Sequence, residues 1–199
     1  MTSALPEPDG PADLRDRAVF LDAAMAMVTR SPTLDDLQVA EVVRRSGRHN
    51  AAFYRLFGSK EGLLLAVVEE AVRRAVIIVR RQMAPAASPA QAVRAWCEAL
   101  LVLAGPEPAP RVPAIALDRF RLLRRFPGAD ATIADPLRHL LRDVLPPGLR
   151  PARDVLADAA FELILSRQAS WIAVGHAPTA REISTYADLV VRLIGLPEG

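Results

Sequence analysis

Cysteine and lysine are nearly absent from this chain of 199 residues, which holds one of each. Cys97 has no partner within the chain, so an internal disulfide is excluded and a reducing cytoplasm is the expected location. Because Cys97 follows Trp96 on an apolar helix, we interpret it as a core residue rather than a sensor thiol. The acidic, proline-rich N-terminus lacks the features of a signal peptide. No apolar run approaches the roughly 18 residues that span a bilayer, so no membrane partner is expected.

Aromatic residues are also scarce, at 5%, although hydrophobic residues together make up 51% of the chain. Runs of aromatic and β-branched residues are too few to favour sheets, and the abundant Ala and Leu favour helices packed around a core. The formal net charge is only +2. Binding to nucleic acid would therefore require a local basic patch rather than the overall charge.

Groups for catalysis or metal binding are sparse as well. The three histidines stand apart from any cysteine or carboxylate at ligand spacing, so no metal site is expected. These are His49, His139 and His176. Ser166 and Ser170 have no histidine placed to activate them, and no glycine-rich phosphate loop is present. We therefore expect neither an enzyme nor a bound cofactor.

Helical periodicity and helix-boundary residues recur along the chain, and they predict an all-α fold of about nine helices without strands. A loose tail is expected over residues 1–12, followed by an amphipathic helix. Its apolar stripe would be Leu14, Ala18, Leu21, Met25 and Val28. Ser59 is placed to cap a long helix beginning at Lys60. Later helices are predicted from Ser88-Pro89, over 113–126, near Pro136, from Pro151, and from the capping box of Thr179 and Glu182.

Residues 38–57 form the most informative segment, because two short helices there are separated by a glycine. The first, over 39–45, would turn its valines inward. Gly47 supplies a tight turn, since glycine accepts positive φ. The second helix has Phe53 and Phe57 on its apolar side. This is the pattern of a helix-turn-helix, whose second helix enters the major groove of DNA.

Charge favours the same interpretation. From Val42 to Lys60 the sequence has five basic residues and no acidic one, and phosphate contacts require such a local cationic surface. The five are Arg44, Arg45, Arg48, Arg55 and Lys60. The segment from Arg119 to Arg125 is a second acid-free basic cluster without any such motif, so charge supports DNA binding only in part.

The sequence resembles the TetR family of one-component bacterial regulators. The resemblance is carried by Ser46-Gly47, by Phe-Tyr-Arg-Leu-Phe at 53–57 and by Ser-Lys-Glu-Gly-Leu at 59–63. These motifs follow one amphipathic helix and precede a long connecting helix, as the family's do. The resemblance covers about residues 13–70, and beyond them only the helix count, the length and a final pair of long helices agree.

The resemblance implies roles for the matching positions. The Tyr54 hydroxyl would contact a backbone phosphate, as would Lys60 at the N-terminus of the connecting helix, where the helix dipole assists. Residues 48–51 would face the groove, and Asn50 would read an adenine edge. The candidate DNA-binding residues are Arg44, Arg48, His49, Asn50, Ala51, Tyr54 and Lys60.

Four positions depart from the family pattern. Arg48 stands where the family has an apolar residue, and His49 where it has Ser or Thr. Ala52 lacks a hydroxyl that often touches phosphate, and Gln38 replaces a Thr or Ser cap. These departures indicate that the operator sequence cannot be inferred by analogy with other members of the family. They also leave open an alternative, an all-α ligand-binding or interaction protein that no longer binds DNA.

The resemblance further implies a helix-turn-helix domain over 13–60 and a ligand-binding and dimerisation domain over 61–199. The last two helices, at about 151–175 and 179–195, would form a four-helix interface in a homodimer. The alternative is that they only cover their own core. Candidate pocket residues, for each of which the favoured alternative is a plain core position, are Trp96, Leu100, Phe120, Leu123, Phe161, Leu165, Gln168 and Trp171.

The expected function is that of a ligand-responsive regulator, a repressor bound to a palindromic operator on double-stranded DNA. A small apolar or amphipathic effector would release it by favouring a dimer whose recognition helices are wrongly spaced.

Overall fold

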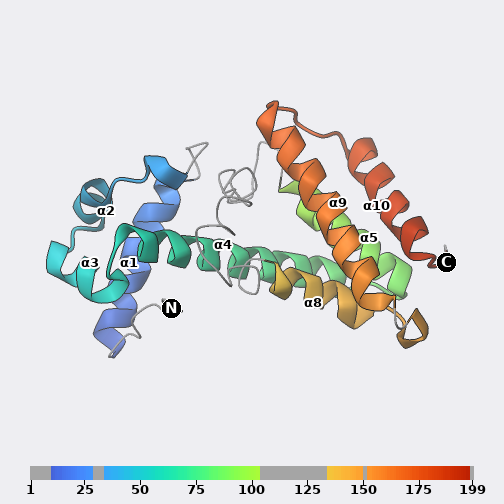
Figure 1. Cartoon of the computed structure of the whole chain (residues 1–199), viewed down its shortest axis with the longest axis horizontal. Coiled ribbons are helices and arrows are strands. Elements are labelled where there is room, and N and C mark those ends of the chain that lie inside the picture. The colour runs from blue at the N-terminus through green and yellow to red at the C-terminus, as the bar shows by residue number, and fades with distance from the viewer. Residues whose placement is uncertain (1–9, 29–33, 104–133, 150–151, 198–199) are drawn as a thin grey trace. The chain divides into compact units, whose positions relative to one another are not determined.

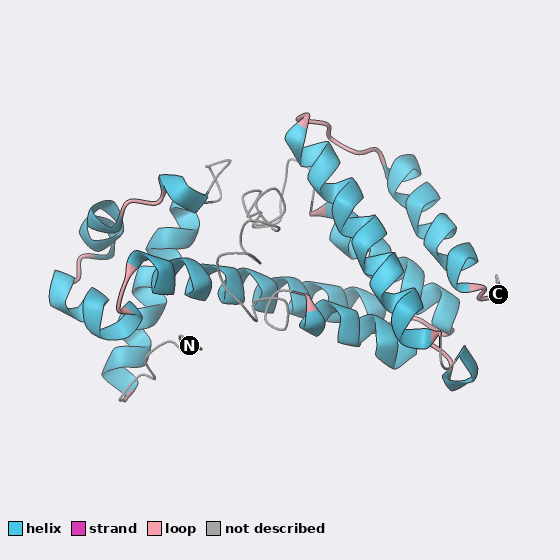
Figure 2. Ribbon diagram, viewed as in Figure 1, coloured by secondary structure: helices cyan, strands magenta, loops and turns pink. Residues whose placement is uncertain are grey.

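The computed structural model describes residues 10–28, 34–103, 134–149 and 152–197. Within these ranges the chain contains eight α-helices, two short 3-10 helices and no strand (Figures 1 and 2). The all-α fold predicted from the sequence is confirmed, with eight described helices where about nine were expected. The helix expected over 113–126 lies outside the described residues. None of the described helices combines the length and apolar character needed to cross a membrane.

The chain divides into two compact units, and the division falls after Ala71. The described part of the first unit comprises 10–28 and 34–71, and that of the second comprises 72–103, 134–149 and 152–197. Helix α4 (Lys60–Met83) contributes residues to both. The domain boundary expected after residue 60 stays a prediction.

The first unit contains α1 (Pro11–Val28), the 3-10 helix η1 (Leu34–Asp36), α2 (Val39–Ser46), α3 (Asn50–Phe57) and the start of α4. Helix α1 packs against α2 and α3. The Phe20 ring meets Phe53 and Phe57 of α3 edge-on, with centroid separations of 5.9 and 5.8 Å. Aromatic pairs favour this geometry, and all three rings are buried. The cluster fixes how α3 lies on α1.

The buried face of α1 agrees with the predicted stripe at Met25 and Val28, which are buried, and differs from it toward the start of the helix. Leu14 is 57% exposed and Ala18 is also exposed, whereas Phe20 and Ala24 are fully buried. Phe20 and Ala24 lie at helical spacing from Val28, as Leu21 and Met25 do, so periodicity alone could not show that Phe20 is buried and Leu14 is exposed. The series that buries the Phe20 ring removes more apolar surface from water, which decides the orientation.

The second unit consists of the rest of α4 with α5 (Pro89–Val102), α8 (Asp135–Val144), the 3-10 helix η2 (Pro147–Leu149), α9 (Arg153–Ala173) and α10 (Ala180–Ile194). Helix α5 is the centre of this unit, because α8, α9 and α10 all pack against it (Figure 1). Trp96 and Phe161 are fully buried between these helices. Their ring centroids lie 6.4 Å apart.

The predicted helix caps are present. The Ser59 hydroxyl accepts a hydrogen bond from Gly62 N at 3.1 Å at the start of α4. Ser88 caps α5 in the same way. Thr179 and Glu182 form the predicted capping box of α10. Each pattern is local, so the sequence carries all the information that it requires.

Candidate functional site

The turn between α2 and α3 depends on Gly47 and Ser46. Gly47 has φ 64° and ψ 20°, in the left-handed region, and its N–H donates to the Arg44 carbonyl at 3.4 Å. The Ser46 hydroxyl donates to the Val43 carbonyl at 2.8 Å and accepts from the Arg48 N–H at 3.2 Å. Ser46 therefore stabilises the turn, a role that its place in the sequence motif did not reveal.

Helix α3 has one buried face and one exposed face. Phe53 and Phe57 belong to the core, as predicted. On the other side, all four positions expected to face the groove, residues 48–51, are exposed. Tyr54 is 53% exposed, and its ring stands edge-on to Phe53 with centroids 5.2 Å apart. The geometry leaves residues 48–51 and Tyr54 on the accessible side of the helix-turn-helix.

Lys60 lies at the first position of α4, where its ammonium group donates to the Asp35 carbonyl at 2.7 Å. This bond ties the start of α4 to η1. An ammonium group has three donors, so one protein acceptor leaves capacity for a phosphate oxygen. The sequence motif had suggested only the phosphate contact.

Two arginines of α2 share one carboxylate. Arg44 donates to both oxygens of Glu41, at 2.7 and 2.6 Å, and Arg45 donates to one of them at 2.6 Å. These hydrogen bonds lower the pKa of Glu41 from 4.5 to about 2. Glu41 therefore stays ionised at neutral pH and offsets part of the positive charge of Arg44 and Arg45.

The other two arginines of the basic stretch pair with α1. Arg48 Nε lies 2.7 Å from an oxygen of Asp16, and Arg55 Nη2 lies 2.5 Å from an oxygen of Asp13. The stretch is free of acids in sequence, but in space its arginines meet three carboxylates from outside it. Counting charges along the chain therefore overstated the basic character of this surface.

Both helices of the motif begin without a side-chain cap. Gln38 and His49 occupy the N-cap positions of α2 and α3 in extended backbone geometry, and neither makes a capping hydrogen bond. Short polar side chains at N-caps accept a hydrogen bond from a backbone N–H of the first helical turn. The two departures from the family pattern, Gln38 and His49, therefore leave α2 and α3 without this bond.

In the second unit, six of the eight candidate pocket residues gather around one core. Trp96, Leu100, Phe161, Leu165 and Trp171 belong to this cluster or pack against it, and Gln168 is 7% exposed. Phe120 and Leu123 lie outside the described residues.

The polar atoms of this core have structural partners. Trp96 Nε1 donates to the Leu137 carbonyl at 3.0 Å, which joins α5 to α8. Gln168 Nε2 donates to the Leu100 carbonyl at 2.6 Å, near the end of α5. Both side chains thus hold helices together, whether or not they also meet a ligand.

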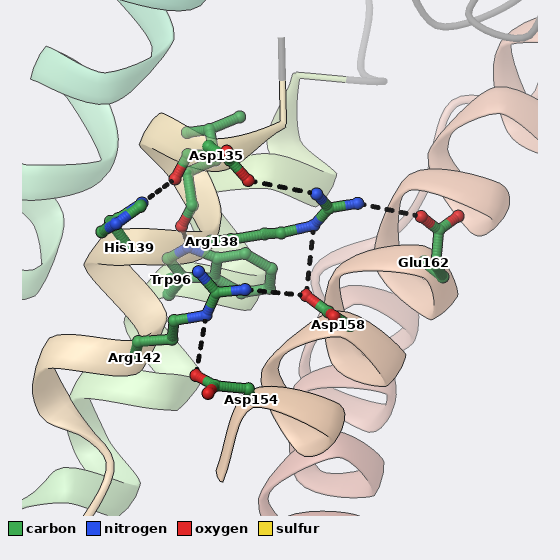
Figure 3. Close-up of polar contacts among 9 residues, drawn as sticks. Trp96, Asp135, Arg138, His139, Arg142, Asp154, Asp158 and Glu162 are labelled. Carbon is green, nitrogen blue, oxygen red and sulfur yellow. Dashed lines mark hydrogen bonds and ion pairs between the residues drawn. The ribbon is translucent and has the colours of Figure 1, made fainter. Parts of the chain in front are cut away.

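Arg138 is a nearly buried cation that the sequence reasoning missed. Its guanidinium carbon lies 4.8 Å from the centre of the Phe161 ring. Its nitrogens lie 3.3 Å from Asp135, 3.4 Å from Asp158 and 3.5 Å from Glu162. Figure 3 shows the guanidinium between α8, which carries it, and the acids of α9. A nearly buried charge requires such partners.

Arg142, one turn further along α8, extends this network. Its Nε lies 3.2 Å from an oxygen of Asp154, and its Nη2 lies 3.2 Å from an oxygen of Asp158 (Figure 3). From sequence, charges on an amphipathic helix look like a solvated face, and only the packing of α8 on α9 shows that they join two helices.

Cys97, His139 and His176 lie where the sequence-based interpretation placed them, in the core and at the surface. Cys97 is fully buried, and this burial raises the pKa of its thiol. His139 is exposed and contacts the Asp135 carbonyl, while His176 lies 3.1 Å from Glu182 after the end of α9. Among the described residues, no three His, Cys, Asp or Glu side chains are grouped to hold a metal ion.

Together, the glycine turn, the buried inner face of α3 and its exposed outer face define a helix-turn-helix protein whose described residues form helices and loops alone. The family model for bacterial regulatory proteins of the TetR family matches residues 20–67, which span the end of α1, α2, α3 and the start of α4. The chain is thus similar to the TetR family over this segment. A comparison with the curated proteins found no match.

Solved structures share the fold across nearly the whole chain. The regulator FadR from Bacillus subtilis, in complex with stearoyl-CoA, has a TM-score of 0.66 at 14% identity and covers 89% of this chain and 96% of its own. FadR from Bacillus halodurans has a TM-score of 0.63 at 18% identity, covering 95% and 97%. RolR in complex with resorcinol also has a TM-score of 0.63 at 18% identity, covering 93% and 90%.

Proposed function

We propose that this protein is a ligand-responsive, DNA-binding transcriptional regulator that represses from a palindromic operator. The observation that carries the proposal is the division of α3 into a face buried by Phe53 and Phe57 and a face on which residues 48–51 and Tyr54 are exposed. A helix so oriented presents its N-terminal residues to the major groove. The family match over residues 20–67 supports this proposal.

Within this interface, residues divide between positioning and reading. Tyr54 and Lys60 would contact phosphates, which orients the protein without reading sequence. Asn50, exposed at the first position of α3, would read a base edge, because an amide pairs bidentately with adenine. His49 and Ala51 flank it on the same exposed segment.

The proposed effector is a small apolar or amphipathic molecule bound among α5, α8 and α9. The apolar cluster around Trp96 and Phe161 supports this chemistry. FadR was solved with stearoyl-CoA and RolR with resorcinol, two ligands of very different size, so the shared fold does not select one effector. We propose that the eight candidate pocket residues, including Phe120 and Leu123, line or border the site.

A homodimer through α9 and α10 would place two recognition helices on the two halves of an operator. Apolar side chains exposed on and beside these helices support this interface: they are Val155, Val174, Leu189 and Leu193, between 47% and 75% exposed. Leu193→Glu should shift the protein to monomers in light scattering without unfolding it. A dimer that persisted would place the interface elsewhere.

The function is tested by selecting bound fragments from genomic DNA at low salt. If no fragment were enriched, the proposal of DNA binding would be contradicted. The variants then separate the roles. Tyr54→Phe keeps the ring against Phe53 and removes only the hydroxyl, so affinity should fall by about tenfold or more per protomer at every salt concentration, the effect of one hydrogen bond to a charged group. Lys60→Ala should instead make log K less dependent on log salt, by about 0.9 per protomer.

Asn50→Ala should change which base pairs are preferred while leaving the salt dependence intact. If sequence preference survived Asn50→Ala, the assignment of base reading to Asn50 would be wrong. The second candidate function, a ligand-binding protein without DNA affinity, is favoured by the internal pairing of Arg44, Arg48 and Arg55. Ligand-induced stabilisation together with no duplex binding at low salt would support it.

A further inference from the structure

Helix α1 places two carboxylates against the helix-turn-helix. Asp16 pairs with Arg48, which precedes α3, and Asp13 pairs with Arg55 inside α3. The side chains of Arg48 and Arg55 are 41% and 53% exposed, whereas those of Asp16 and Asp13 are 27% and 13% exposed. The acids therefore lie deeper than the arginines that they hold, on the protein side of the surface.

The contact to Arg48 leaves the end of its guanidinium group for other acceptors. The closest approach of this ion pair is at Nε, which lies 2.7 Å from an Asp16 oxygen, and a guanidinium group carries five N–H donors in all. The two terminal nitrogens are the atoms with which arginine reads guanine O6 and N7 in the major groove. A carboxylate on Nε thus restricts the side chain without occupying the atoms that would read a base.

The same contact should weaken binding that does not depend on sequence. A mobile arginine finds phosphate oxygens anywhere along a duplex, and each phosphate neutralised releases counterions. An arginine held by a carboxylate contributes less to this term, because its charge is already partly compensated and its side chain is restrained. Arg48 is one of the exposed residues immediately before α3, so the restraint acts beside the reading surface.

We propose that Asp16 is a positioning residue that sets sequence specificity, holding Arg48 toward base edges and away from phosphates. Asp13 acts in parallel on Arg55, whose charge it withholds from the DNA backbone. The inference rests on the proposed function, since it requires a DNA interface at residues 48–55. It adds that α1 is part of the apparatus that discriminates between sequences.

The test uses the full chain with two probes, a random-sequence duplex and a duplex library with a randomised centre. Asp16→Asn should bind the random duplex about two- to fivefold more tightly at low salt, the range that a half-exposed ion pair contributes. The slope of log K against log salt should steepen by about 0.9 per protomer. Sequences enriched from the library should lose preference at one base pair in each half-site.

Three further variants isolate the contact. Asp143→Asn makes the same charge change at an exposed site of the second unit and should leave both readouts unchanged. Asp16→Glu keeps the charge and should retain the wild-type salt slope. In an Arg48→Gln background, Asp16→Asn should have no further effect, because the residue through which it acts has been removed.

The outcomes distinguish this inference from the function on which it rests. A wild-type protein that bound neither probe would overturn the proposed function and the inference with it. If the wild type bound DNA and Asp16→Asn had the same salt slope and the same sequence preference, the inference would be overturned and the proposed function would stand. An effect of Asp16→Asn that persisted in the Arg48→Gln background would also overturn it, since that would indicate general repulsion between Asp16 and DNA.

Discussion

Gly47 offers a clean test of how the helix-turn-helix is built. Its φ of 64° is strained for any residue with a Cβ, yet a Cβ added there would meet no atom within 4 Å. Gly47→Ala therefore costs only the left-handed backbone term, about 1–2 kcal/mol. The alanine also restricts the unfolded chain, which returns about 0.4–1 kcal/mol. We expect a net loss of about 1 kcal/mol in the free energy of unfolding.

Thermal unfolding measures this loss as a decrease in Tm of about 2–4 °C for a chain of this size. Because the chain has two compact units, hydrogen exchange at the amides of α2 and α3 should localise the effect. Gly148→Ala is the matched control, since its Cβ would also meet nothing and its φ is not positive. That variant should be as stable as the wild type or slightly more so.

Two results would refute the reasoning. Equal stability of Gly47→Ala and the wild type would mean that the turn accepts a Cβ without strain. A loss beyond about 3 kcal/mol would exceed the backbone term and would require a steric contact that the turn geometry excludes. Affinity for a selected duplex should fall with Gly47→Ala, because the turn orients α3.

Three further predictions concern a helix cap, a carboxylate and the thiol. Gln38→Ser should raise the free energy of unfolding by about 1 kcal/mol in urea titrations, because the N-cap of α2 has extended geometry but no side-chain cap. Hydrogen bonds from Thr179 lower the pKa of Glu182 below 4.5. The ionised carboxylate therefore adds to the free energy of unfolding above pH 4.5, and this stabilisation is lost as the pH falls through the folded-state pKa. Glu182→Gln should thus be less stable than the wild type at neutral pH and equal to it in strong acid. Cys97 should react with a thiol reagent only after unfolding, and modification of the native protein at the rate of an exposed thiol would contradict its burial.

Features that depend on neighbours in sequence were predictable. The caps at Ser59, Ser88 and Thr179 each require a side chain and a backbone N–H only a few residues away, so the sequence contains the whole interaction. The turn at Gly47 is of the same kind, because positive φ strongly favours glycine. These local signals suffice to predict the helix-turn-helix and the all-α fold.

Features that depend on packing were not predictable. The apolar residues of α1 satisfy a helical period on two faces, and only the rings of Phe53 and Phe57 decide that Phe20 faces inward. Gln168 bonds to the Leu100 carbonyl, 68 residues earlier in the chain. The burial of Arg138 depends on the packing of α8 against α9. In each case the partner is distant in sequence, and no periodicity or spacing identifies it.

The net charge of the first unit bears on how the protein would bind DNA. Its described ranges, 10–28 and 34–71, carry seven basic and nine acidic side chains, so their total charge does not attract DNA. Affinity for phosphate must then come from individual groups placed at the interface. These are the side chains of Tyr54 and Lys60 and the N-termini of α3 and α4. With Arg44, Arg48 and Arg55 already paired to carboxylates, the sequence-independent part of binding should be weak. Such an interface would discriminate between sequences mainly through base contacts, which is the property that the pairing of Asp16 with Arg48 serves.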